Sequence, residues 1–200
     1  MKLSKYIALV CFVGLAGCAA DYRPLQLERS GNAVILRGEI DGRSQQLLES
    51  FLSQNEDITT LVLQNIGGSV DDEANLQFGR AVRSLGLNTR VPANGMVASG
   101  GTDLFLAGVE RRLDPGACVG VHEWATYAST ASDLSRDDPV HDEYLVYYDD
   151  IGIDRAFYWF TLEAAPAESM YWMTAQDAER FGLSTSRTPQ LGAASSCDAR

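Results

Sequence analysis

Three short segments of the 200-residue chain carry residue types that can together perform acyl transfer. Residues 65–70 contain two consecutive glycines, residues 97–101 contain Ser99 among small residues, and residues 120–124 contain His122. Acyl transfer requires an activated hydroxyl, a base with a pKa near neutrality and two fixed N–H donors for the tetrahedral oxyanion. In this order, the segments can supply an oxyanion site, a nucleophile and a base.

Each of these segments lies where an apolar run meets a turn, which is where α/β proteins place reactive groups. Residues 60–64 predict a buried strand, and the two glycines that follow allow positive φ and a close approach of another backbone. Residues 100–108 predict a helix, so Ser99 lies at its N-terminus, where free N–H groups favour negative charge. Residues 117–121 predict a strand with His122 at its tip.

The remaining sequence alternates between predicted strands and predicted helices. This alternation favours an α/β fold with a mainly parallel sheet and helices on its faces. The length suits a single core, which we place at residues 31–185, with a tether at 18–30 and a tail at 186–200. The predicted strands are 33–36, 60–64, 88–91 and two near Arg111 and Val119, and the predicted helices are 43–54, 70–85 and 100–108.

Four motifs occur in a fixed order along the chain. A Gly-Gly turn follows a strand, and a small-Ser-small turn at Ser99 opens a helix that leads to an Ala-Gly pair and two arginines. A Pro-Gly turn precedes His122, and residues 173–183 predict a late helix that ends in Phe-Gly-Leu. In this combination, residues 33–183 resemble the Clp protease proteolytic subunit and its relatives in the ClpP/crotonase superfamily. The resemblance implies a spiral of repeated β-β-α units around a mainly parallel sheet.

The resemblance also implies roles for individual residues. Ser99 corresponds to the nucleophile of the family and His122 to its general base. The backbone N–H groups of Gly68 and Gly100 correspond to the oxyanion hole. The chain departs from the family at the acidic member of the triad, because Met170 occupies that position and cannot orient an imidazole.

The sequence does not indicate which group replaces the missing acid of the triad. A backbone carbonyl or one of four nearby carboxylates can hold His122, so a Ser-His dyad and an inactive site both remain open. Loss of the orienting acid lowers turnover by about four orders of magnitude in triad enzymes. The four carboxylates are those of Asp149, Asp150, Asp154 and Glu168.

The same residues are also compatible with purely structural roles. A serine among small residues at a helix start is commonly an N-cap, and Gly67 and Gly68 can form a simple strand-to-helix turn. His122 can be a hydrogen-bonded strand residue. His141 lies in the polar run 135–143 and is predicted to be solvated.

The N-terminus predicts export. Residues 1–5 are basic, residues 6–15 are apolar but too short to span a bilayer, and Leu-Ala-Gly-Cys ends the segment at Cys18. This resembles the bacterial lipobox, in which residues 1–17 are the signal peptide and the cysteine carries the lipid. An ordinary secretory signal cut after Ala20 is the alternative. We expect a periplasmic protein with a lipid anchor, favouring the outer membrane.

Export leaves Cys118 and Cys197 as the mature thiols, because Cys11 is removed with the signal and Cys18 carries lipid. A pair in an oxidising compartment predicts one disulfide, which would tie the otherwise loose tail at 192–196 to the strand that presents His122. Two free thiols are the alternative, with Cys118 buried as a small apolar residue.

Charge limits the partners and mechanisms. The formal net charge is −11, and removal of Lys2 and Lys5 with the signal makes it −13 and leaves no lysine. A Ser-Lys dyad, as in the related signal peptide peptidase A, is therefore excluded. The acidic surface argues against nucleic acid and anionic headgroups as ligands. We expect no metal, no cofactor and, outside the cytoplasm, no ATPase partner.

These observations predict a membrane-anchored serine hydrolase that cleaves unfolded or short peptides through Ser99 and His122. A catalytically weak or inactive peptide-binding or scaffold lipoprotein is the alternative. Acyl-CoA chemistry of the crotonase kind is disfavoured, because CoA thioesters are cytoplasmic. The aromatic residues between 144 and 160 suit either the core or a homo-oligomeric interface.

Overall fold

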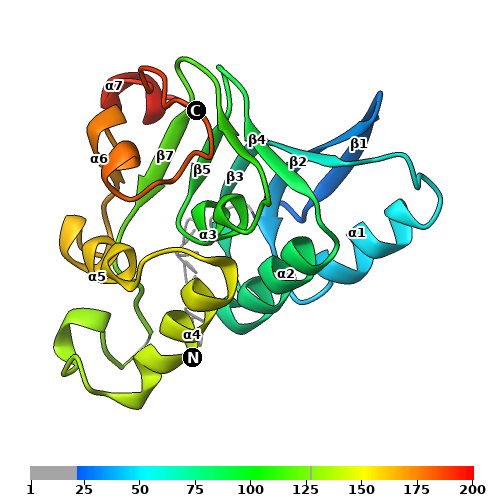
Figure 1. The fold of residues 1–200 in the computed structure, drawn as a ribbon. Coiled ribbons are helices and arrows are strands. Elements are labelled where there is room, and N and C mark those ends of the chain that lie inside the picture. The colour runs from blue at the N-terminus through cyan, green and yellow to red at the C-terminus, as the bar shows by residue number, and fades with distance from the viewer. Residues whose placement is uncertain (1–21, 127) are drawn as a thin grey trace, which may run out of the picture.

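The computed structural model describes residues 22–126 and 128–200 (Figure 1). The signal peptide predicted at residues 1–17 and the lipidation site predicted at Cys18 lie outside these residues. Within the described ranges, no helix combines the length and apolar character needed to cross a bilayer. The same ranges contain no group of three or more His, Cys, Asp or Glu side chains arranged to hold a metal ion.

An eight-stranded sheet forms the centre of the described chain (Figure 1). Its main order is β1-β2-β3-β5-β7-β8, and β4 joins β3 to β6. All pairs are parallel except the terminal pairs β1/β2 and β7/β8. This mostly parallel sheet confirms the predicted α/β class. The strands are β1 (Gln26–Ser30), β2 (Ala33–Ile40), β3 (Thr60–Ser69), β4 (Asn88–Val91), β5 (Met96–Ala98), β6 (Arg111–Leu113), β7 (Cys118–Val121) and β8 (Tyr171–Trp172).

Helices cover the sheet and connect its parallel strands. The helices predicted at 43–54, 70–85 and 100–108 agree with α1, α2 and α3 to within two residues at each end. The helices are α1 (Ser44–Leu52), α2 (Asp72–Ser84), α3 (Gly100–Leu106), α4 (Asp142–Ile151), α5 (Arg155–Ala164), α6 (Ala175–Arg180) and α7 (Ala194–Cys197), with 3₁₀ turns at Ala131–Asp133 and Pro139–His141.

Strand β3 divides the sheet into two branches. Its first part, from Thr60 to Val62, pairs with β4, whereas Asn65 and Ile66 pair with β5. The second branch continues through β5 to β7, so the carboxyl ends of these three strands lie at the same edge. Short β5 was missing from the predicted elements, and without it Ser99 would have no strand to fix its position.

One continuous hydrophobic core lies between the sheet and the helices. Strand residues such as Leu61 and Val97 are fully buried, and α3 inserts Phe105 into the same cluster. A Cβ atom at Gly101 would lie only 2.4 Å from the carbonyl oxygen of Ile66, so α3 rests directly on β3. Four aromatic residues of α4 and α5 also belong to this core, which favours core packing over a subunit interface for them: Tyr147, Tyr148, Phe157 and Tyr158.

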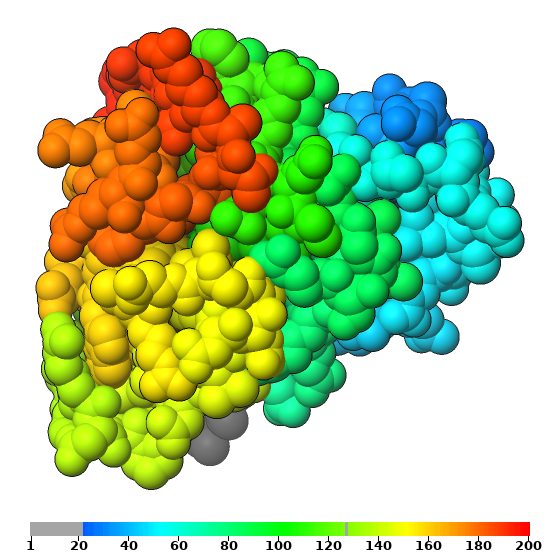
Figure 2. Space-filling model, in the orientation of Figure 1, coloured from blue at the N-terminus to red at the C-terminus, as the bar shows by residue number. Residues whose placement is uncertain are grey.

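Both ends of the described chain are held against the sheet. Part of the segment expected as a tether forms β1, which pairs with β2. The predicted disulfide between Cys118 and Cys197 is present. As expected from that bond, the tail lies against the strand that presents His122, and Gly192 N–H also donates to Ala117 O at 2.9 Å. Figure 2 shows these C-terminal residues, in red, against the green strand region.

Candidate active site

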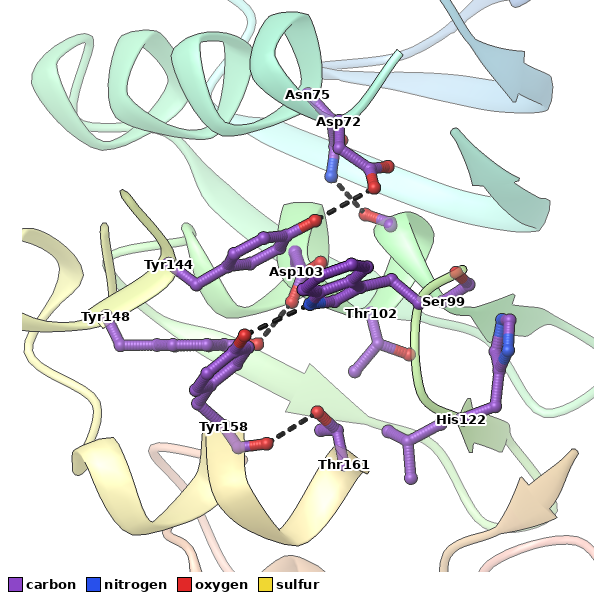
Figure 3. A pocket seen from close by; sticks show the side chains of 13 residues that line it. Asp72, Asn75, Ser99, Thr102, Asp103, His122, Tyr144, Tyr148, Tyr158 and Thr161 are labelled. Atoms are coloured by element: carbon purple, nitrogen blue, oxygen red, sulfur yellow. Dashed lines mark hydrogen bonds between the residues drawn. The ribbon is translucent and has the colours of Figure 1, made fainter. Parts of the chain in front are cut away.

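The carboxyl ends of β3, β5 and β7 bring the three predicted segments together. Ile66 of β3 pairs with Val97 of β5, which in turn pairs with Val119 of β7. Because the three strands are parallel and adjacent, the residues that follow them meet at one edge of the sheet. Ser99 and His122 accordingly line the same pocket (Figure 3). Gly100 also lines it.

The backbone of Ser99 adopts an unusual conformation. Its φ is 52° and its ψ is −130°, and among the described non-glycine residues it alone has a positive φ. Its N–H donates to Gly120 O at 3.1 Å, which fixes the turn between β5 and α3. A strained residue on a strand-to-helix turn is typical of nucleophiles that must present their hydroxyl at the end of a sheet.

The side chain of Ser99 does not perform the structural role that its position permits. Ser99 is at the N-cap position of α3, yet its hydroxyl accepts no hydrogen bond from the first turn of the helix. The simple N-cap interpretation is therefore wrong for this serine. Ser99 is partly exposed and lines the pocket.

The two glycines assigned to the oxyanion site lie on either side of Ser99. A Cβ atom at Gly68 would lie 3.4 Å from Ser99 Cβ and 3.8 Å from Ser99 Oγ, so the β3 backbone passes directly beside the hydroxyl. Gly100 is the first residue of α3, where a backbone N–H has no intrahelical acceptor. Asn75 Nδ2 donates to Gly100 O at 3.1 Å and holds this turn in place.

His122 lies at the end of β7 without an orienting partner. Its Nδ1 is buried and has no hydrogen-bond partner among the described residues. Within the same residues, no hydrogen bond joins His122 to Ser99. Catalytic hydrogen bonds are often long in ligand-free enzymes and tighten when substrate binds. The unpaired Nδ1 is the more serious departure from a triad, because nothing fixes the tautomer of the ring.

None of the four carboxylates considered as substitutes bonds to His122. Asp149 pairs with Arg155, and Asp150 pairs with Arg80 at 2.8 Å. Asp154 caps α5 by accepting from the N–H of Ala156 at 2.8 Å, and Glu168 is exposed. These side chains have structural roles or face solvent, so the structure does not support any of them as the third member of a triad.

Met170 lies where an orienting acid would be needed. Strands β7 and β8 pair Gly120 with Trp172 and Val121 with Tyr171. Continuing this antiparallel register by one residue places Met170 opposite His122, on the same face of the sheet. A Cβ atom at Gly120 would lie 2.7 Å from Met170 Sδ, which confirms that this side chain covers the end of β7.

The prediction that His141 is solvated was wrong. His141 is only 1% exposed, and its Nδ1 is 2.6 Å from Tyr158 Oη. Tyr158 also accepts a hydrogen bond from Trp124 Nε1 at 3.0 Å. The polar residues around His141 in sequence face outward from a 3₁₀ turn, while the imidazole points inward and braces the aromatic wall of the pocket.

The pocket itself is small, with a cavity volume of about 40 Å³. Beyond Ser99 and His122, it contains two carboxylates and an aromatic wall that the sequence did not assign to the site (Figure 3). Asp103 lies on α3, one turn after Ser99, and Asp72 lies at the start of α2. Burial raises the pKa of Asp103 to about 7, the nearby Asp72 carboxylate also raises it, and the hydrogen bond from Tyr148 lowers it.

The chain is similar in fold to several proteins of known structure. No protein-family model and no curated protein matches the chain, whereas many solved structures are similar to it. An enoyl-CoA hydratase/isomerase from Cupriavidus metallidurans CH34 has a TM-score of 0.50 and 16% identity, over 88% of this chain and 70% of that one. An enoyl-CoA isomerase from Mtb has a TM-score of 0.50 and 13% identity, over 85% and 76%.

A third structure is a variant of the 1510-N membrane-bound stomatin-specific protease. Its TM-score is 0.52 at 11% identity, over 80% of this chain and 77% of that one. The chain has the ClpP/crotonase fold. At these identities the likeness concerns the fold alone, because the same fold serves both hydratases and a protease among these structures.

Proposed function

We propose that the protein is a serine hydrolase that cleaves peptide bonds in unfolded or short substrates. The observation that carries the proposal is the conformation of Ser99. Its hydroxyl caps nothing, lies on a strained turn beside the Gly68 backbone and shares a pocket with His122. A peptide rather than an acyl-CoA substrate is favoured by this nucleophile, and one structure of the same fold is a protease.

The proposed reaction follows from these positions. Ser99 Oγ attacks the substrate carbonyl carbon while His122 takes the hydroxyl proton. Nε2 is the ring nitrogen for this role, because Nδ1 is buried. The N–H groups of Gly68 and Gly100 stabilise the oxyanion. His122 then returns the proton to the leaving amine, and water hydrolyses the ester formed on Ser99.

The unpartnered Nδ1 predicts that turnover is slow. For Nε2 to act as the base, the proton of neutral His122 must lie on Nδ1, where neither the neutral ring nor the imidazolium finds an acceptor among the described residues, and an unsatisfied buried donor costs about 1–3 kcal/mol. This same observation favours the alternative function, which is a peptide-binding protein that retains the fold and pocket but does not turn over.

Labelling of the purified protein with a fluorophosphonate probe distinguishes the two functions. We expect wild-type protein to be labelled between about pH 6 and 9. Ser99→Ala should show no labelling, and His122→Ala should be labelled about a hundredfold more slowly or less. Labelling that persists in Ser99→Ala would place the nucleophile elsewhere. Unlabelled wild-type protein across this pH range would support the binding function.

The proposed location is the periplasmic face of the bacterial envelope, with a lipid anchor at Cys18. The support is the N-terminal sequence, in which a basic start and a short apolar run precede Leu-Ala-Gly-Cys. On this basis, wild-type protein should partition into detergent with the membrane fraction. Cys18→Ser should accumulate unprocessed or appear in the soluble fraction. Soluble wild-type protein that begins at Asp21 would instead show an ordinary secretory signal.

A further inference from the structure

The pocket beside Ser99 contains two carboxylates without a cationic partner. Neither Asp72 nor Asp103 takes part in a salt bridge within the described residues. The residues that line the pocket include no arginine or lysine. By contrast, the buried carboxylate of Asp114 pairs with Arg90. The unpaired state of the two pocket carboxylates therefore needs an explanation.

Asp103 is the inner of the two carboxylates. Its Oδ1 accepts a hydrogen bond from Tyr148 Oη at 2.5 Å, whereas no donor to Oδ2 is present in the described part of the chain. The side chain is partly exposed, as expected of a group that faces a cavity. Burial raises the pKa of Asp103 to about 7 in the ligand-free protein, so a proton or another cation readily completes this site.

Asp72 lies at the mouth of the pocket and is held in a fixed orientation. Its Oδ1 accepts from Ser69 Oγ at 2.6 Å, and its Oδ2 accepts from Tyr144 Oη at 2.8 Å. Ser69 directly follows Gly68, so this carboxylate is tied to the strand end that forms the oxyanion site. The two carboxylates thus place negative charge at both the entrance and the interior of the cavity (Figure 3).

The walls of the pocket are aromatic and suit a cation. The rings of Trp124 and Tyr144 are nearly parallel, with centroids 6.3 Å apart, and Tyr144 stacks on Tyr158 at 5.1 Å. Aromatic faces attract ammonium and guanidinium groups, most strongly where water is excluded. Asn75 also lines the pocket and is 1% exposed, and within the described ranges its buried Oδ1 has no hydrogen-bond partner.

We infer that this pocket is a specificity subsite for a cationic side chain, the ammonium of lysine or the guanidinium of arginine, next to the bond that Ser99 attacks. Asp103 and Asn75 accept from the bound cation, while Trp124 and Tyr144 cover its alkyl chain. The strongly acidic protein also attracts such substrates over longer distances. The role of this subsite in peptide cleavage rests on the proposed hydrolase function. Binding of the cation itself does not require turnover.

Calorimetric titration of the Ser99→Ala variant with n-butylammonium tests the subsite without any contribution from hydrolysis. We expect saturable binding at pH 8, at least about tenfold tighter than binding of the neutral isostere n-butanol. Asp103→Asn in the same background keeps an acceptor for Tyr148 and should weaken n-butylammonium binding by about tenfold or more. Asp150→Asn is the matched control, because this carboxylate pairs with Arg80 outside the pocket.

The affinity for n-butylammonium should also increase with pH. The carboxylate form of Asp103 binds the cation, and its pKa in the free protein is about 7, so binding should strengthen as the pH rises from 6 to 8. Asp103→Asn should remove most of this pH dependence. That result would distinguish the titration of Asp103 from the titration of its neighbours. The neighbouring titratable groups are Asp72, His122, Tyr144, Tyr147, Tyr148 and Tyr158.

Equal binding of n-butylammonium and n-butanol, or unchanged affinity in Asp103→Asn, would overturn the subsite. Both outcomes are independent of whether Ser99 reacts with a fluorophosphonate. If the cation binds as expected and wild-type protein is not labelled, the subsite stands and the hydrolase proposal fails. If labelling occurs, phosphonate probes that carry lysine should react faster than norleucine probes, and Asp103→Asn should abolish that preference.

Discussion

Replacement of Met170 by aspartate should raise the rate of peptide or ester hydrolysis by about two to four orders of magnitude. The register of β7 and β8 places residue 170 opposite His122, whose Nδ1 is buried without a partner. The oxygens of aspartate and the Nδ1 of histidine both lie two bonds beyond Cβ, so side chains on opposite strands can meet. The new carboxylate would fix the tautomer of His122 and stabilise the imidazolium.

The matched control is Met170→Asn, which has the same shape without the charge. Asparagine can hold the ring but cannot stabilise the imidazolium, so its rate should remain close to that of wild type. Addition of Ser99→Ala to the Met170→Asp protein should abolish the gained activity. An aspartate variant that is folded, has the expected mass and is no faster than wild type would contradict the role assigned to His122.

The sequence was sufficient to predict that the three segments lie at the ends of neighbouring strands. Gly68, Ser99 and His122 each follow an apolar run, and parallel strands bring their carboxyl ends to one edge. The role of the Ser99 hydroxyl could not be predicted so directly from the sequence. An N-cap and a nucleophile have the same local sequence, and only the conformation of the turn separates them.

The sequence did not assign Asp103 or Tyr148, which form the inner part of the pocket, to the site. Asp103 had a usable signal, because it is the one charged residue in the otherwise small and apolar stretch 100–108 and lies one helical turn after Ser99. Its partner Tyr148 is 45 residues away, and its contact with Asp103 depends on how α4 packs against α2 and α3. No local pattern predicts such a contact.

His141 shows the limit of composition as a guide to burial. Five acidic or basic residues surround it between positions 135 and 143, which indicates a solvated segment. The chain instead forms a 3₁₀ turn at this point and directs the imidazole onto Tyr158 and Trp159. A single inward side chain in a short turn leaves no periodic signal, because the segment is too short to show one.

Removal of the disulfide should lower the free energy of unfolding by about 4 kcal/mol. Cys118 and Cys197 are separated by 79 positions, so the bond restricts a long loop in the unfolded chain. Both cysteines are nearly fully buried. A Cβ atom at Gly192 would lie within 2.8 Å of both sulfurs, which shows that the tail packs directly on the bond.

Urea denaturation of the Cys118→Ala/Cys197→Ala protein, compared with oxidised wild type, measures this effect. Wild type treated with a reductant is the control, and it should lose a similar amount of stability without a change of sequence. Fluorophosphonate labelling of the folded double variant should persist, because the pairing of β7 with β5 that positions His122 does not involve the sulfurs. A loss below about 1 kcal/mol would show that the tail contacts already restrict the chain as strongly as the disulfide does.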